Sequence, residues 1–478
     1  MIRRTLFRGA SIVTMDYMTP DLTGDLLVED EKIAAIAPQL EVGDAEVVDA
    51  SGMILHPGFI DTHRHVWQTT LKGTAIDWSL FNYLTWMRTM YPVCYTPEDA
   101  ELANYAGALE ALNAGITTLV DHSHLQLSEL HSDALVEGLL AAGIRGIYAY
   151  GAYNNPSYKP GGEIDIPALG QELFTPLTDF HRKNGARIRE KYFPSDKGLV
   201  RFGVSTSEFS AYPDMARVIS EIAWSRDLGA ARISMHTGVG LQNEHRFVQG
   251  LEDAGLISDD MLFVHGAHLT DEEIRAIVRA GATVSSTPET ELQMGMGYPV
   301  TDRLAEAGGH PNLGIDIVSN FAGDMYGQMR LMLQTRRFKD YQLEGRLPST
   351  MRYAARNLLH AATMGGAYAL GMDTSIGSLT VGKQADIVMM RTDSVPMTPV
   401  NDPVGAIMFY ANPTDIDAVM VGGRFVKRDG KLVGVDWPSI CKNLYRSRDA
   451  IASRLALIPE EKIAAAWANN FHIEQAAH

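Results

Sequence analysis

The sequence has few cysteines, no long apolar run and a shortage of basic residues. Cys94 and Cys441 are the only cysteines among 478 residues, which excludes a disulfide framework beyond one bridge. No apolar stretch approaches the roughly 20 residues that a membrane-spanning helix needs, and Arg8 and Gly9 interrupt the first apolar residues, which argues against a signal peptide. The formal net charge of −17 argues against nucleic acid or a membrane as a partner. We therefore expect a cytoplasmic protein.

The two ends of the chain predict a small β domain. Both contain short runs in which apolar and polar residues alternate, as in 25–29 and 416–421, and this period of two is typical of a half-buried sheet. We expect the two ends to meet in one β-sandwich, although two separate β appendages would give the same pattern. The predicted division is 1–56 and 375–436 for the two parts of the sandwich, 57–374 for a central domain and 437–478 for a helical tail, which could clasp the sandwich or a partner subunit.

The central domain alternates between strand and helix patterns. Helical patterns separate most of the apolar strand candidates, which lie at 53–60, 116–121, 145–150, 199–205, 231–236, 261–265, 282–286 and 312–317. Eight such units predict an α/β fold, a parallel (β/α)₈ TIM barrel, whose chemistry lies at the C-terminal ends of its strands.

Histidines and one aspartate stand at these predicted strand ends. His63 and His65 follow the first strand two residues apart, a spacing that places both side chains on one face. His236, His265 and Asp316 end the fifth, sixth and eighth strands. Taken singly, each is explained as an ordinary polar residue or helix cap. Together they put four imidazoles and a carboxylate around one barrel mouth, which indicates a metal centre, since imidazole nitrogen binds zinc, iron, cobalt and nickel.

Four segments, HPGFIDTHRH, FVHGAHLTDEEI, LGIDIVSN and SIGSLTVGKQADIVMM, resemble the amidohydrolase superfamily. The branch they are similar to holds cytosine and guanine deaminases and the atrazine and ethylammeline chlorohydrolases. The resemblance covers nearly the whole chain and implies a metal-dependent hydrolase of small molecules. It implies that one divalent metal, zinc first and iron, cobalt or manganese as alternatives, binds to His63, His65, His236 and Asp316, and that His265 faces the substrate. Relatives are commonly oligomeric, so we expect a homo-oligomer.

Two departures from this branch affect the predicted chemistry. Binuclear relatives need a carboxylated Lys on the fourth strand, and 200–208 contains no Lys, which favours one metal ion. The deaminases have a proton-carrying Glu three residues after the strand-five His, where this chain has Val239. Hydrolysis of an amide, urea or carbamate needs mainly carbonyl polarisation, whereas deamination of a heterocycle needs its ring nitrogen protonated.

The predicted function is therefore metal-dependent cleavage of a non-peptide C–N bond of amide, urea or carbamate type. Asp316 would accept the proton of the attacking water, and His265 would stabilise the charge that develops on the substrate. Glu244, Glu289 or Glu291 could replace the missing Glu, which keeps an aminohydrolase or dechlorinase of an N-heterocycle as the alternative. A non-catalytic binding protein is the remote alternative, because every residue of the metal constellation is present.

Candidate substrate contacts come from the loops around the barrel mouth. Aromatic residues after the first strand, among them Trp67 and Trp86, suggest an apolar or aromatic substrate, although 79–90 would equally form an amphipathic helix that packs on the barrel. Relatives place a Gln at the position of Gln68. His122 and His124 follow the second strand, where lining the pocket is favoured over a second metal site. The predicted substrate-binding residues are Gln68, Trp67, Trp86, His124, Glu289 and Glu291.

Overall fold

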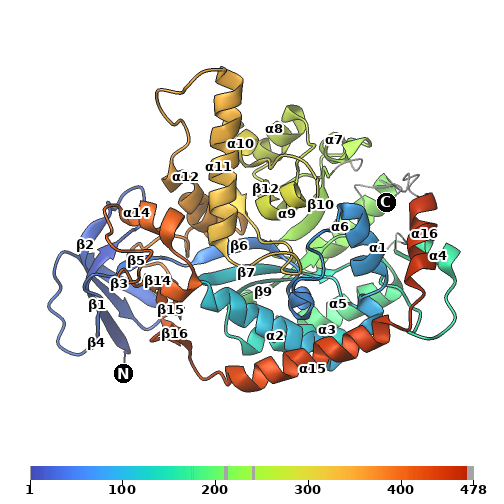
Figure 1. Cartoon of the computed structure of the whole chain (residues 1–478), viewed down its shortest axis with the longest axis horizontal. Helices are drawn as coiled ribbons and strands as arrows, with labels where there is room; N and C mark the ends of the chain where they lie inside the picture. Colours follow the sequence, from blue (N-terminus) through green and yellow to red (C-terminus); the bar gives the residue numbers. More distant parts are fainter. Residues whose placement is uncertain (1, 174, 176, 209–213, 240–242, 471–478) are drawn as a thin grey trace.

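The computed structural model describes residues 2–173, 175, 177–208, 214–239 and 243–470. Two sheets organise the chain (Figure 1). One of them contains eight strands, in chain order β6 (Phe59–Arg64), β7 (Ile116–Ser123), β8 (Arg145–Gly151), β9 (Val200–Ser205), β10 (Ile233–Thr237), β11 (Met261–His265), β12 (Thr283–Ser286) and β13 (Asn312–Leu313). Neighbouring strands are parallel, and a parallel bridge between Arg64 and Asp316 joins the first strand to the last segment. The predicted (β/α)₈ barrel is confirmed.

Buried apolar strands and capped helices build this barrel. Every residue of β7 and of β11 is buried, as expected for strands that helices cover on the outside. Thr96 and Thr270 cap α2 and α8, since each accepts a hydrogen bond from the backbone three residues later. The outer helices are α2 (Pro97–Asn113), α3 (Glu129–Ala141), α5 (Asp179–Tyr192), α6 (Met215–Asp227), α7 (Phe247–Asp253), α8 (Asp271–Arg279), α10 (Thr301–Glu306) and α11 (Met325–Glu344).

Shorter helices complete the barrel and its rim. The 3₁₀ helix η1 (Val66–Leu71) and helix α1 (Leu80–Thr89) follow β6 directly. Further short helices are α4 (Ile166–Leu173), α9 (Pro288–Gln293), α12 (Ala355–His360) and α13 (Gly366–Ala369) and, on the side of the second sheet, α14 (Pro403–Gly405) (Figure 1). The predicted amphipathic helix over 79–90 thus corresponds to α1, which begins after the capping residue Ser79.

The second sheet contains strands from both ends of the chain. Its nine strands are β1 (Arg4–Ile12), β2 (Leu22–Glu29), β3 (Lys32–Ala37), β4 (Glu46–Asp49), β5 (Ile54–Pro57), β14 (Ile387–Met390), β15 (Ile416–Val421), β16 (Arg424–Arg428) and β17 (Lys431–Leu432). β5 and β14 join the two ends by antiparallel pairing, and apolar side chains from both ends, such as Phe7 and Met420, share one core. The prediction that both ends build one β domain is confirmed, in the form of a mixed sheet. The division of the chain into domains by residue number stays a proposal.

Two predicted strands differ from the observed ones. The apolar run 53–60 forms two strands, β5 in the small sheet and β6 in the barrel, separated at Gly58. Periodicity alone does not tell which sheet a strand joins, so this division was not predicted. The predicted strand 312–317 shortens to β13, and beyond it Asp316 pairs with Arg64 only as an isolated bridge.

The C-terminal tail packs on the barrel. In Figure 1, α15 (Trp437–Leu455) runs below α2 and α3, and α16 (Glu460–Asn470) lies near α1 and α4. Ser447 and Arg454 of α15 bind the Asp99 carboxylate of α2 at 2.6 and 2.8 Å. The tail thus clasps the barrel, where we had expected the sandwich or a partner subunit.

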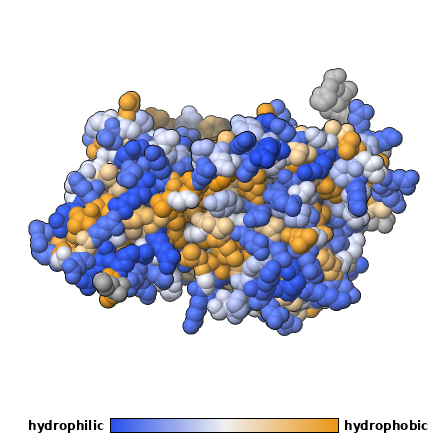
Figure 2. Space-filling model, turned by 90° about the horizontal axis from the view of Figure 1, so that it is seen from below, coloured by the Kyte–Doolittle hydropathy of each residue, from blue (hydrophilic) through white to orange (hydrophobic). Residues whose placement is uncertain are grey.

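The face of the molecule seen in Figure 2 combines charged and apolar areas. Figure 2 shows the lower face, where apolar residues gather near the middle between charged ones. Helix α15 contains exposed aromatic side chains, including Trp437 and Tyr445. Among the described helices, none combines the length and apolar character needed to cross a bilayer.

Candidate active site

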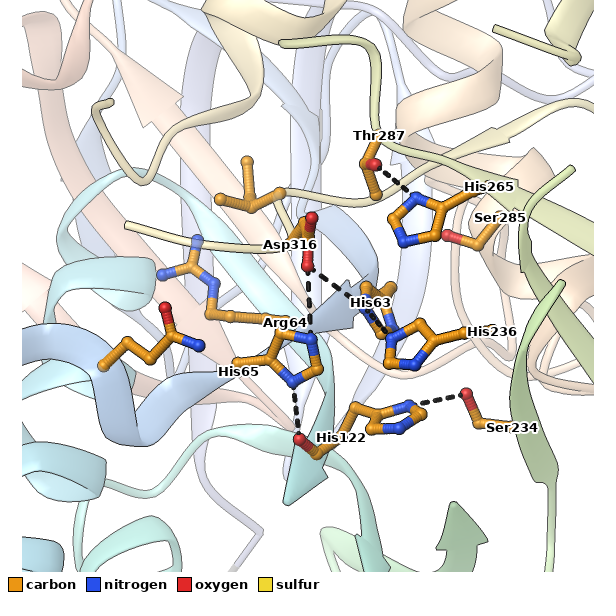
Figure 3. A network of polar contacts seen from close by, with 12 residues as sticks. His63, Arg64, His65, His122, Ser234, His236, His265, Ser285, Thr287 and Asp316 are labelled. Carbon is orange, nitrogen blue, oxygen red and sulfur yellow. Dashed lines mark hydrogen bonds and ion pairs between the residues drawn. The ribbon is translucent and has the colours of Figure 1, made fainter. Parts of the chain in front are cut away.

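Three histidines and an aspartate converge at the mouth of the barrel (Figure 3). His63 lies on β6, His65 directly follows it, His236 lies on β10 and Asp316 follows β13. The Oδ1 atom of Asp316 lies 3.3 Å from His63 Nε2 and 3.2 Å from His65 Nε2. His236 Nε2 lies 3.4 Å from His63 Nε2. The structure therefore brings together the residues predicted to bind metal.

The other ring nitrogens determine what this cluster can bind. His65 Nδ1 donates to the backbone carbonyl of His122 at 2.8 Å, since a carbonyl only accepts. His236 Nδ1 donates to the carboxylate of Glu208 at 3.0 Å. In neutral rings, the Nε2 atoms of both residues then carry lone pairs, and that of His65 lies only 3.2 Å from the carboxylate of Asp316. A cation between them removes this repulsion, so the donor set fits a divalent metal.

The ionisation states agree with metal binding. Burial lowers the pKa of His63 well below its ordinary value and also lowers that of His65, so both rings are neutral. Burial alone would raise the pKa of Asp316, but its contact with His63 and the charge of nearby His265 outweigh burial and hold it well below the ordinary value. Neutral imidazoles and an ionised carboxylate are the forms that bind metals.

The backbone around Asp316 is held by a buried ion pair. Asp61 binds Arg64 at 2.7 Å, and its other oxygen accepts from the backbone of Ile315 at 2.9 Å. Asp316 and His265 both have positive φ, +69° and +73°, which is uncommon for residues with a side chain. Such strained conformations persist only where surrounding contacts fix them, and they cluster at functional sites.

His265 stands at the edge of the cluster with two partners behind it. Its Nδ1 lies 3.0 Å from Thr287 Oγ1 and 3.4 Å from the carboxylate of Glu291, and that same oxygen of Glu291 accepts from the backbone of Thr287 at 2.8 Å. Burial lowers the pKa of His265, but Glu291 and the other nearby carboxylates outweigh burial and raise it. The predicted loop residue Glu291 thus both caps α9 and orients His265.

The other predicted substrate contacts are held mainly by the protein. Gln68 is fully buried, donates to Tyr83 Oη at 2.6 Å and accepts from Ser319 at 3.1 Å. Glu289 is tied to Gln328 of α11 at 2.9 Å, and burial together with repulsion by Asp324 raises its pKa to about 7.

The two tryptophans lie in different surroundings. Trp67 is buried and donates to His124 Nδ1 at 3.4 Å, which places it beside the histidines. Trp86 donates to Glu460 of α16 at 2.9 Å. The interaction with α16 supports the alternative in which 79–90 packs against protein, and we propose no substrate contact for Trp86.

Sequence reasoning missed two residues of the site. Glu208, in the loop after β9, orients His236, and Arg88, in the last turn of α1, is buried beside Tyr153. The position of Glu208 just beyond the fourth strand, at the end of the barrel where the histidines lie, was the available indication. Val239 is buried, with 3% of its surface exposed, and its aliphatic side chain has no proton that it could transfer to a substrate.

Comparison with known proteins agrees with this geometry. Residues 54–426 match the family described as the amidohydrolase family. The chain belongs to the amidohydrolase family. This amidohydrolase is 30% identical to 8-oxoguanine deaminase of Pseudomonas aeruginosa, over 91% of this chain and 96% of that protein. It is 26% identical to 5-methylthioadenosine/S-adenosylhomocysteine deaminase of Thermococcus kodakarensis, over 84% and 89%.

Solved structures share the fold. A mutant of atrazine chlorohydrolase from Arthrobacter aurescens, complexed with zinc and atraton, has a TM-score of 0.78 and 25% identity over 93% of this chain and 100% of that chain. An adenosine deaminase from Xanthomonas campestris with bound zinc has a TM-score of 0.78 at 21% identity, over 94% and 98%. The predicted superfamily is confirmed. As a member of this metal-dependent family, the protein is a hydrolytic enzyme that acts on non-peptide C–N bonds.

Proposed function

We propose that this amidohydrolase removes ammonia from an aminated N-heterocycle. The observation that carries the proposal is the His265–Glu291 pair, which places an imidazole that can hold a proton beside the metal-binding cluster. It offers a proton to the ring nitrogen, the task for which Val239 is unsuited. Similarity to two deaminases over most of the chain supports the same reaction.

Each residue of the cluster has a proposed role. His63, His65, His236 and Asp316 would hold one divalent ion, zinc first, which supplies a Lewis acid and lowers the pKa of water from 15.7 to about 7. The ionised Asp316 accepts the proton of the attacking water and passes it to the departing nitrogen. His265 donates a hydrogen bond, or its proton, to the ring nitrogen next to the attacked carbon. The C–N bond breaks, the hydroxyl on the attacked carbon becomes a carbonyl and returns its proton to His265, and ammonia leaves.

A second candidate is hydrolysis of an amide, urea or carbamate. The buried Val239 favours it, because the position used by the deaminase branch for proton transfer is apolar here. Carbonyl substrates need polarisation of one oxygen, and His265 provides a hydrogen bond for it.

One experiment separates the two candidates. Metal-loaded protein is mixed with aminated pyrimidines, purines and triazines and, separately, with N-aryl ureas, carbamates and amides, and both ammonia and organic amine are measured. We expect ammonia from a heterocycle and none from the Asp316→Asn variant. Organic amine from the second set without ammonia from the first would contradict the proposal and establish the second candidate.

Assembly and location stay proposals too. We propose a cytoplasmic homo-oligomer that takes small molecules. The far end of α11 and the segment after it expose apolar side chains, including Phe338 at 60%, Leu343 at 77% and Leu347 at 86%, and burial of such side chains in a subunit interface is favourable. Light scattering of the purified protein tests the assembly, and a monomer would contradict it.

A further inference from the structure

A buried arginine without an ionic partner lies next to the candidate active site. Arg88 is 5% exposed, and its guanidinium carbon lies 4.6 Å from the centre of the Tyr153 ring. Among the described residues its guanidinium forms no ion pair, and Nη1 has no hydrogen-bond partner. An unpaired buried charge is costly, so proteins keep one where an opposite charge binds.

Other polar atoms without partners lie close to Arg88. The Tyr153 ring is 5.3 Å from His124 and 6.1 Å from His122, and the His122 and His124 rings are 5.5 Å apart. Within the described chain, Tyr153 Oη, His122 Nε2 and His124 Nε2 are buried without a hydrogen-bond partner. One small region therefore holds four unpartnered polar groups.

The tautomer of His124 shows what these groups bind. Trp67 Nε1–H is only a donor, so His124 Nδ1 accepts from it, and a neutral His124 then carries its proton on Nε2. His124 Nε2 is therefore a donor and lacks the free lone pair that a metal ligand needs. The charge of Arg88 also acts on His122 and His124, which further disfavours a second cation. Arg88, His124 and Tyr153 together present donors, the arrangement that suits an anion.

Glu208 is an alternative partner for Arg88. The charge of Arg88 acts on Glu208, but the carboxylate of Glu208 binds His236 at 3.0 Å, and no ion pair joins it to Arg88 in the described chain. The C-terminal turn of α1 favours a cation near its end but supplies no counterion. Neither Glu208 nor the end of α1 therefore balances the charge of the Arg88 guanidinium.

We propose that Arg88, His124 and Tyr153 bind a carboxylate group of the substrate beside the metal centre. The rings of His124 and His65 stack with their centroids 3.9 Å apart, so the carboxylate would lie next to the metal ligand His65. The substrate class is then an anionic N-heterocycle, with its carboxylate a few bonds from the C–N bond that breaks. The statement that this substrate is deaminated rests on the proposed function. The statement that the three residues bind a carboxylate does not.

Binding of matched ligand pairs tests the inference. Aminated pyrimidines, pyridines and triazines, each as the carboxylate and as the neutral carboxamide, are titrated calorimetrically into the metal-loaded full chain. We expect at least one carboxylate to bind tenfold or more tightly than its carboxamide. Arg88→Gln should reduce this preference to twofold or less, whereas Arg424→Gln, the same charge change on β16 of the small sheet, should keep it. No preference in any pair, or a preference that survives Arg88→Gln, would overturn the proposal.

A stability measurement guards against a purely structural role. Arg145 is a partly buried arginine with a carboxylate partner, Asp386 at 2.7 Å, and therefore serves as the control. We expect Arg145→Gln to lower Tm and Arg88→Gln to leave it unchanged or raise it. An equal fall in both variants would mean that the protein itself compensates Arg88, and would contradict the proposal. Tighter binding of carboxylates without ammonia release would support the carboxylate site and contradict the proposed function. Ammonia release without tighter binding of carboxylates would support the proposed function and contradict the carboxylate site.

Discussion

Two groups of imidazoles lie side by side at the barrel mouth and differ in the contacts of their Nδ1 atoms. In the first group, His65 and His236 donate from Nδ1 to an acceptor, which leaves lone pairs on Nε2. In the second, His124 accepts at Nδ1 from Trp67, which leaves a proton on Nε2. The rings of His65 and His124 are only 3.9 Å apart. The same residue type therefore serves as metal ligand or hydrogen-bond donor according to its neighbour.

Replacement of one histidine from each group gives the largest predicted difference in metal content and turnover. His65→Gln should remove the metal and lower turnover by about 10³-fold or more, because metal-assisted attack supplies several kcal/mol. His124→Gln should keep one metal ion per chain. Metal content by mass spectrometry and kcat on the same samples check both. Metal loss in His124→Gln would mean that the second group also coordinates metal.

Removal of the partner of His236 should weaken metal binding. Glu208→Ala leaves Nδ1 of His236 without its acceptor, and loss of such a partner lowers metal affinity by about 10–100-fold. Glu208→Gln, which keeps an acceptor oxygen, should lie between wild type and Glu208→Ala. Competition with a chelator measures the affinity. Equal affinities in all three proteins would show that Glu208 does not orient the ligand.

The pair behind His265 should affect turnover and not metal binding. Glu291→Ala removes the carboxylate that holds His265, and we expect kcat to fall by about tenfold as proton delivery is impaired. KM and metal content should change less than twofold. A fall in metal content together with kcat would contradict this prediction, because it would mean that Glu291 also holds the metal ligands in place.

The neighbouring loop glutamate should affect only stability. The pKa of Glu289 is raised from 4.5 to about 7, so the folded protein holds this proton more tightly than the unfolded chain and loses stability as pH rises from about 4.5 to about 7. Glu289→Gln should match wild type near pH 4 and be more stable by about 1–2 kcal/mol at pH 8. Urea unfolding at both pH values checks this. A variant that is less stable at pH 8 would contradict the assignment.

Much of the fold and of the metal cluster followed from local patterns. Strand-end positions placed His63, His236 and Asp316 at one mouth, because in a parallel barrel all strands end on the same side. The division of 53–60 into β5 and β6 did not follow, since an apolar run does not show which sheet it joins. The docking of α15 on α2 depends on side-chain contacts, such as Arg454 with Asp99, that have no periodic pattern.

The second half of the site was hidden for a related reason. Arg88 lies in an ordinary amphipathic helix, where an arginine normally lies in solvent, and only its burial without a counterion marks it. Glu208 lies in an irregular loop, and its function depends on a single contact across the barrel with His236. Contacts between residues so far apart in the sequence are visible only in the three-dimensional structure.

Anomalous diffraction from zinc-loaded crystals tests the central comparison most directly. The account predicts one zinc peak per chain, within bonding distance of His63, His65, His236 and Asp316. A zinc peak between His122 and His124, alone or beside the first, would contradict the division into metal ligands and hydrogen-bond donors.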